Sequence, residues 1–156
     1  MNQKQNVQGF VDVCIENING NKKEYTIKNT ILKKGKEALA MSLANEVGDR
    51  YSFYISKMIF GNGGTLNDQP RIVEQSRNSL FGTKVVDRPI IASIDPSVTS
   101  QVVFTTVIPF DTGNGSVLNE MALEMNNGDL YSMVTFSDLT KTDQIQITWN
   151  WRINFL

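Results

Sequence analysis

The chain has 156 residues and a formal net charge of −1 at pH 7, so it can form one domain with its own core and has no general attraction to nucleic acid or membranes. It contains no histidine, which excludes histidine-based catalysis, histidine metal ligands and a histidine pH switch. Cys14 is the only cysteine, so an internal disulfide and a cysteine-based zinc site are excluded as well.

The N-terminal part of the chain predicts a β-hairpin over residues 8–31. The first residues, MNQKQNVQGF, lack the apolar segment of a signal peptide, and no run in the chain reaches transmembrane length, which predicts a soluble, cytosolic chain. Apolar and polar residues alternate in QGFVDVCIENI, and Asn19-Gly20 favours a tight turn before the return strand KEYTIKNTI. We expect Cys14 to be buried in the first strand as a small hydrophobic residue.

One helix is predicted in the N-terminal third, over residues 32–47. Asn29 or Thr30 can cap its start, and Gly48 suits the left-handed conformation just past its end. Helical spacing places apolar residues on one stripe, which comprises Leu32, Leu39, Ala40, Leu43, Ala44 and Val47. Such a stripe is typical of a helix that packs against a core.

Three lysines, Lys33, Lys34 and Lys36, crowd the first turn of this helix. The helix dipole favours negative charge there, and we expect no acid nearby in the sequence to match them. These lysines are therefore either an ordinary solvated face or the contact for an acidic partner.

Charge is also uneven along the whole chain. Residues 1–36 hold seven lysines against three acids, whereas residues 95–156 hold two basic residues against seven acids. Solvated faces explain this pattern, but it also suits head-to-tail contact between copies or a charged neighbour. The predicted interface comprises Lys33, Lys34, Lys36, Arg152 and Asn154.

A strand followed by a glycine loop comes next, in YSFYISKMIFGNGG. Gly61, Gly63 and Gly64 suggest a phosphate-binding loop, but no Gly-Lys-Ser/Thr follows and TLNDQPR does not open a helix. We therefore expect these glycines to serve turn geometry. Residues 65–83 are polar and irregular, with an isolated Leu-Phe pair as an apolar anchor.

Alternating segments continue to the end of the chain and give about eight strands in total, with turns at DTGNGS and NNGD. The pattern predicts a mainly β chain that forms a single domain over residues 1–156. We expect an antiparallel β-sandwich or jelly-roll-like fold with one α-helix in the N-terminal third and the remaining strands within residues 51–156.

No catalytic, cofactor or metal site is predicted. Glu120 and Glu124 could form a carboxylate pair on one strand face, but nothing in the sequence marks either as desolvated. Asp111, Asn114 and Ser116 could donate oxygens to calcium, yet their spacing matches no EF-hand loop and an ordinary turn explains them.

The closing strand is unusually long. From Ile145 to Phe155 apolar and polar residues alternate, with Trp149 and Trp151 on the apolar side, which we expect to be buried. Ordinary strands have about 5–6 residues. Either a neighbouring copy or protein completes the end of this strand, or a bend or bulge splits it into two strands of one core.

Several segments keep a recognisable order: ISKMIFGNGGT, SLFG, VLNEMALEM, GDLY, TKT and ITWNWRINF. This order resembles structural proteins of tailed-bacteriophage virions, and especially the N-terminal attachment domain of tail-collar fibre proteins. The resemblance covers roughly residues 55–156 and implies a non-enzymatic piece of the particle. No trimeric shaft repeat follows in this sequence, which favours a stand-alone adaptor or decoration subunit over a fibre.

The resemblance implies a tail, neck, baseplate or fibre-attachment adaptor, made in the host cytoplasm and located in the virion. The alternatives are a capsid decoration protein and a carbohydrate-binding module with Tyr51, Phe53 and Tyr54 as an aromatic platform. Expected partners are other copies of the chain, as a trimer, and other virion proteins. We expect no cofactor and no nucleic-acid, membrane or small-molecule partner.

Overall fold

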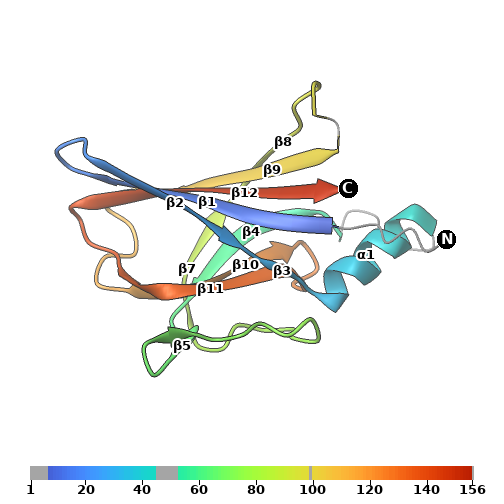
Figure 1. Ribbon diagram of the computed structural model, residues 1–156, viewed down its shortest axis with the longest axis horizontal. Coiled ribbons are helices and arrows are strands. Elements are labelled where there is room, and N and C mark those ends of the chain that lie inside the picture. The colour runs from blue at the N-terminus through green and yellow to red at the C-terminus, as the bar shows by residue number, and fades with distance from the viewer. Residues whose placement is uncertain (1–6, 45–52, 99, 156) are drawn as a thin grey trace.

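Two five-stranded antiparallel sheets face one another in the computed structural model (Figure 1). The structure describes residues 7–44, 53–98 and 100–155. Sheet A has the strand order β2-β1-β12-β9-β8, and sheet B has the order β3-β11-β10-β4-β7. The elements are β1 (Val7–Asn17), β2 (Lys22–Lys28), β3 (Thr30–Ile31), α1 (Lys33–Ala44), β4 (Ile55–Gly61), β5 (Thr65–Leu66), β6 (Gln69–Pro70), β7 (Lys84–Pro89), β8 (Ile91–Ser93), β9 (Gln101–Ile108), β10 (Val117–Met125), β11 (Leu130–Thr140) and β12 (Ile145–Phe155).

The predicted fold class is confirmed, because the described residues form antiparallel sheets with α1 in the N-terminal third. They contain twelve strands instead of about eight. The short strands β3, β5, β6 and β8 account for the difference, since two or three residues are too few to show an alternating pattern.

The closing strand β12 lies at the centre of sheet A, between β1 and β9. It pairs with β1 from Ile145 to Phe155 and with β9 from Ile147 to Asn154, without any shift in register. Both interpretations of its length were therefore wrong: the strand is not split, and its edges are paired within the chain. Trp149 and Trp151 are fully buried, as predicted.

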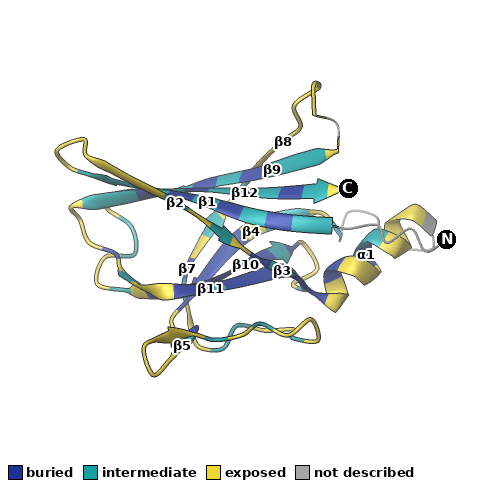
Figure 2. Cartoon of the chain, in the orientation of Figure 1, coloured by how far each residue is buried: buried dark blue, intermediate teal, exposed yellow. Residues whose placement is uncertain are grey.

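The main core fills the space between the two sheets, and the buried residues in Figure 2 concentrate on the strands that enclose it. Residues of β12 meet residues of β4 and β11 there. The ring of Trp149 lies 5.0 Å from that of Phe60 and 5.6 Å from that of Phe136. Aromatic side chains bury large apolar areas, so these rings supply much of the hydrophobic stabilisation.

Sheet B is covered on its outer face as well. A second cluster there contains the buried residues Leu32, Ile59, Ala122, Leu130 and Met133, with Val73, Leu80 and Phe81 packed against it. The last three belong to the segment between β4 and β7, which runs below sheet B in Figure 1. The predicted Leu-Phe anchor is thus confirmed, and it explains why β10 and β11 are buried almost continuously.

Helix α1 differs from its prediction at its start and on its packed face. It begins at Lys33, directly after Leu32, and β3 separates it from Asn29, so neither predicted residue caps it. The predicted apolar stripe does not cover the core, because Leu43 is 82% exposed. Gly35 faces β11 instead, where an added Cβ would collide with the carbonyl oxygen of Tyr131.

Small residues therefore allow α1 to approach sheet B closely, and Ala38 is buried there together with Gly35. The predicted end of the helix, at Val47 and Gly48, lies outside the described residues. Sequence periodicity identified the helix but not the face that contacts the sheet.

The chain crosses between the sheets at four places. It passes from sheet A to sheet B between β2 and β3 and between β9 and β10, and from sheet B to sheet A between β7 and β8 and between β11 and β12. β3 pairs with β11 only at Ser132 and Met133. Among the described residues, the rest of that edge of β11 has no strand paired with it in sheet B. Two of the surfaces described below lie on this side.

Candidate interaction surfaces

A buried carboxylate in β10 holds two loops on the outer face of sheet B. Glu120 is fully buried, and its Oε1 accepts hydrogen bonds from the backbone N–H of Gly63 (3.0 Å) and of Gly82 (2.8 Å). Its Oε2 accepts a third, from the N–H of Phe81 (2.7 Å). The sequence did not mark this carboxylate as desolvated, because the loops that bury it lie far away in the sequence.

The neighbouring Asn119 holds the same glycine loop. Its Oδ1 accepts from the N–H of Gly64 (2.6 Å), and its Nδ2 donates to the carbonyl oxygen of Asn62 (3.2 Å) and to Asp138 (3.0 Å). Asn119 and Glu120 thus form one clamp, which we call the loop clamp. The segments GNGG, SLFG and NEMAL that carried the family resemblance meet in this clamp.

The glycines of the loop serve close packing and not turn geometry. Gly61, Gly63 and Gly64 have no positive φ, whereas Gly20 and Gly128 in the hairpin turns do. A Cβ on Gly63 would collide with the backbone of Gly82, and one on Gly64 would collide with that of Asn119. The prediction of turn geometry was therefore wrong for these three positions.

A lysine ammonium occupies the loop that was considered for calcium. Lys141 is fully buried, and its Nζ donates to Asn114 Oδ1 (2.8 Å) and to the carbonyl oxygens of Thr142 (2.8 Å) and Phe110 (3.3 Å). These oxygens thus already serve an internal cation. In the described part of the chain, no group of three or more His, Cys, Asp or Glu side chains is placed to hold a metal ion.

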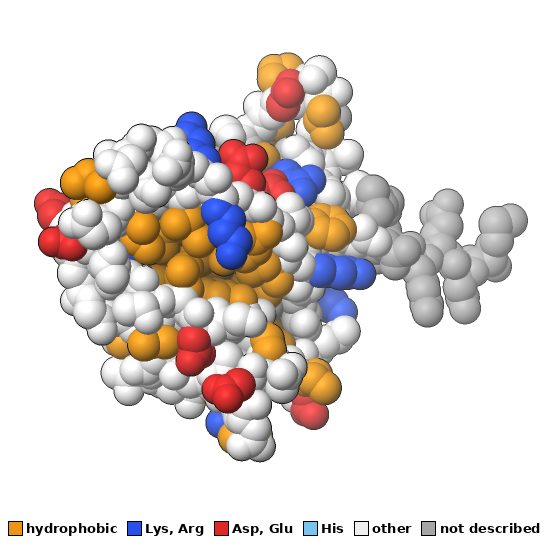
Figure 3. Space-filling model, turned by 60° about the vertical axis from the view of Figure 1, so that its left-hand side comes forward, with side chains coloured by type: hydrophobic (Ala, Val, Ile, Leu, Met, Phe, Trp, Pro, Cys, Tyr) orange, Lys and Arg blue, Asp and Glu red, His pale blue; other side chains and the backbone are white. Residues whose placement is uncertain are grey.

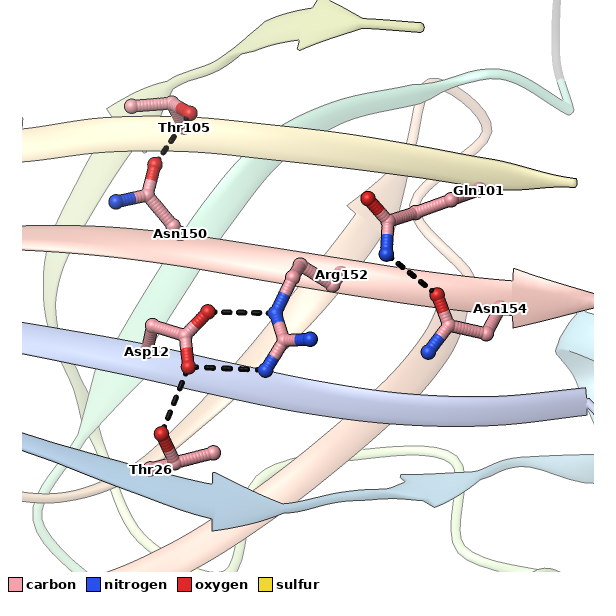
Figure 4. Close-up of polar contacts among 7 residues, drawn as sticks. All are labelled: Asp12, Thr26, Gln101, Thr105, Asn150, Arg152 and Asn154. Carbon is pink, nitrogen blue, oxygen red and sulfur yellow. Dashed lines mark hydrogen bonds and ion pairs between the residues drawn. The ribbon is translucent and has the colours of Figure 1, made fainter. Parts of the chain in front are cut away.

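The outer face of sheet A carries an ion pair between neighbouring strands. Arg152 on β12 donates from Nε to Asp12 Oδ2 (2.6 Å) and from a terminal nitrogen to Asp12 Oδ1 (3.0 Å), and the Thr26 hydroxyl donates to Asp12 Oδ1 (2.7 Å) (Figure 4). Cys14 is also on this face, half-buried instead of buried as predicted.

The same face carries two further side-chain pairs. Gln101 donates to Asn154 (2.7 Å), and Thr105 donates to Asn150 (2.7 Å), each between β9 and β12 (Figure 4). The predicted interface residues Arg152 and Asn154 thus have partners within the chain. Their role in an interface stays a prediction.

The Asp12–Arg152 pair should make stability depend on acid pH. Burial raises the pKa of Asp12, but the hydrogen bonds from Arg152 and Thr26 and the charge of Arg152 outweigh it and leave this pKa below its usual value. A lowered pKa stabilises the fold above about pH 3.9 and loses this contribution as pH falls through the folded-state pKa. Asp12→Asn should therefore cost under about 1 kcal/mol at pH 7, since the pair is partly exposed.

The measurement is chemical denaturation of both proteins from neutral to strongly acid pH. The difference in unfolding free energy between wild type and Asp12→Asn should shrink below about pH 4. A difference that stays constant down to the acid limit would contradict this assignment.

The three predicted interface lysines on α1 do not act alike. Lys33 and Lys34 both pair with Glu37, at 3.8 Å each, so the expectation that no nearby acid matches them was wrong. Lys36 instead donates to Gln75 Oε1 (3.1 Å) of the segment that covers sheet B. All three lie on α1, which packs against β11, whereas Arg152 and Asn154 belong to sheet A.

An apolar side opening of about 440 Å³ lies between β2 and β11. Its lining includes Ile15, Tyr25, Ile27, Phe136 and Leu139, with Lys23 and Asp138 among its polar members. Hydrophobic side chains gather in the middle of the face that Figure 3 shows, on this side of the sandwich. The edge strand β2 carries Lys22, Lys23 and Lys28 beside this opening. Lysines on an edge strand disfavour its pairing with a strand of another chain.

A second apolar hollow, the end pocket, has a volume of about 310 Å³ and is lined by Phe53, Tyr54, Ile55, Ala92, Val102, Phe104, Tyr131, Ile153 and Phe155. Tyr54 is 52% exposed and Phe155 is 38% exposed. The only polar side-chain groups among these residues are the two tyrosine hydroxyls. Carbohydrate recognition needs several hydrogen-bonding groups, so the arrangement suits an apolar contact better than a sugar.

Tyr51, the third member of the proposed aromatic platform, lies outside the described residues. Among the residues described, no helix has the length and apolar character needed to cross a membrane.

Comparison with known proteins gave one match. The model of the family described as phage tail-collar fibre protein, N-terminal, matches residues 23–152 of the chain. No curated protein and no solved structure matches it. The matched residues include α1, the loop clamp and most of both sheets.

Proposed function

The chain belongs to the phage tail-collar fibre protein family, through that family's N-terminal domain, and on this basis we propose that it acts as an attachment adaptor in a phage tail. Membership confirms the resemblance and supports a structural role in the tail. The family is one of structural virion proteins, in keeping with the prediction of a chain without catalytic function.

The family match over residues 23–152 carries this proposal. The structure adds a reason why the family-like segments belong together, since they meet in the loop clamp, which holds two loops against sheet B. A two-sheet scaffold that presents an apolar end suits a protein that joins others. The end pocket is the surface that best fits this task, because Tyr54 and Phe155 expose apolar area beside it.

Self-association as a trimer remains a prediction. The long closing strand no longer supports it, because both edges of β12 are paired within the chain. The expected contact with other virion proteins does not require an unpaired edge of that strand.

Replacing Tyr54 and Phe155 together by serine should lower incorporation into phage particles several-fold. Both side chains are partly exposed, so the free energy of unfolding should fall by no more than about 1–2 kcal/mol. Ile72→Ser is the matched control, since Ile72 is 88% exposed but lies on the segment that covers sheet B.

The measurement is the amount of the chain in purified particles by mass spectrometry, with its position determined from the particle density. Wild-type protein that is absent from particles would overturn the proposed function. Equal incorporation of the double variant and the control would show that the end pocket is not the contact surface of the attachment adaptor.

A further inference from the structure

We propose that a groove between β1, β3 and the start of α1 binds an acidic side chain of a partner protein. This proposal rests on the attachment function and names the chemistry of one contact. The groove has a volume of about 340 Å³, and its lining includes Gly9, Lys28, Asn29, Lys36 and Gln75. None of the described residues that line it is acidic.

The first observation is a buried amide without a partner. Asn29 connects β2 to β3, and its backbone N–H donates to the carbonyl oxygen of Gly9 (3.0 Å). The residue is only 8% exposed, yet neither Oδ1 nor Nδ2 of its side chain has a hydrogen-bond partner. Buried polar groups are nearly always paired, so this amide requires an explanation.

Gly9 makes room for this amide. A Cβ at that position would collide with the side chain of Asn29, so only glycine leaves the space in which the amide lies. The amide thus lies against Gly9 where the chain passes from β2 to β3.

The second observation is the charge around the groove. Lys28 and Lys36 line it and are exposed, and Lys36 Nζ donates to the neutral oxygen of Gln75. Glu37, the residue after Lys36, pairs instead with Lys33 and Lys34. The groove thus offers cationic and amide donors without an internal carboxylate.

The unpaired amide decides the class of ligand. Neither amide atom of Asn29 is exposed to solvent, so a ligand reaches them only when this side chain turns into the groove. The amide then offers a donor and an acceptor, and its complete pairing needs a ligand with both. An Asp or Glu residue in an extended segment offers a carboxylate for Nδ2 and the lysines, and a main-chain N–H for Oδ1. A phosphate of a nucleic acid offers acceptors only, and the net charge of −1 gives no general attraction to nucleic acid.

The test uses the full chain, labelled for NMR, and a short capped peptide of alternating Glu and Thr. Added peptide should shift the side-chain amide signals of Asn29 and the backbone amide of Gly9. Lys36→Gln should weaken binding roughly fivefold, and added salt should weaken it further. Lys34→Gln is the matched control on the same helical turn and should bind as wild type does.

Asn29→Ala provides a second variant, since its side chain makes no hydrogen bond that the fold would lose. It should bind the Glu peptide more weakly, with no change in the Lys36–Gln75 contact. Equal binding by Lys36→Gln and Lys34→Gln, or equal binding of a peptide with Gln at every Glu, would overturn the proposal.

Two other outcomes would also overturn it. Binding of a short fluorescent DNA with the same dependence on Lys36 would assign the groove to nucleic acid. Shifts of the Asn29 signals with protein concentration alone would assign it to a second copy of the chain. If the chain is absent from particles, the attachment function fails; if it is present and the peptide does not bind, only the groove proposal fails.

Discussion

Replacing Trp149 or Trp151 by alanine should lower the free energy of unfolding by about 3–5 kcal/mol. Both side chains are fully buried between the sheets, and Trp149 packs against Phe60 and Phe136, so alanine would leave a cavity that the surrounding strands cannot fill. This is the range expected for removal of a fully buried aromatic side chain. Chemical denaturation measures the loss.

Two kinds of variant control for this effect. Asn150→Ser and Arg152→Ser alter the opposite face of β12 and should each cost about 1 kcal/mol or less, because they remove only partly exposed polar contacts. Trp149→Phe should cost less than Trp149→Ala, since the indole N–H has no hydrogen-bond partner to lose. Equal tolerance of changes on both faces would show that the alternating face is not the core.

Replacing Glu120 by alanine should lower the free energy of unfolding by about 3–5 kcal/mol as well. The change leaves the N–H groups of Gly63, Phe81 and Gly82 without their side-chain acceptor. Glu120→Gln should fall between wild type and alanine. Its single oxygen can serve the two glycines, while its amide group would face the Phe81 N–H.

Glu124→Gln is the matched control for the loop clamp. Glu124 is on the same strand but only half-buried, and its change should cost within about 0.5 kcal/mol. Protease digestion under native conditions adds a local readout, because release of the clamp should expose the segment between β4 and β7 first. If Glu120→Ala and Glu124→Gln proved equally stable, the clamp would have no energetic role.

The amino-acid sequence was sufficient to identify the long strands and their buried faces. Alternation of apolar and polar residues is a local property of a strand, so the inward direction of Trp149 and Trp151 follows from β12 alone. The order of the family-like segments was also readable along the chain, and the match over residues 23–152 confirms it.

The partners of each element were not readable in this way. The central place of β12 follows from pairing with β1 and β9, which are far from it in the sequence. The packed face of α1 was misjudged because Gly35 permits close approach to β11, which outweighs the apolar stripe in deciding the contact.

The loop clamp shows most clearly the difference between what the sequence indicates and what only the tertiary structure decides. Glu120 is desolvated by Gly63 and Gly82, which lie 57 and 38 positions away, and no local pattern marks it as buried. The groove beside Asn29 forms only where β1, β3 and α1 meet, and the lack of a partner for its buried amide is likewise a property of the tertiary structure. Periodicity reports which way a side chain points, whereas burial and hydrogen bonding depend on the residues that the tertiary fold brings to it.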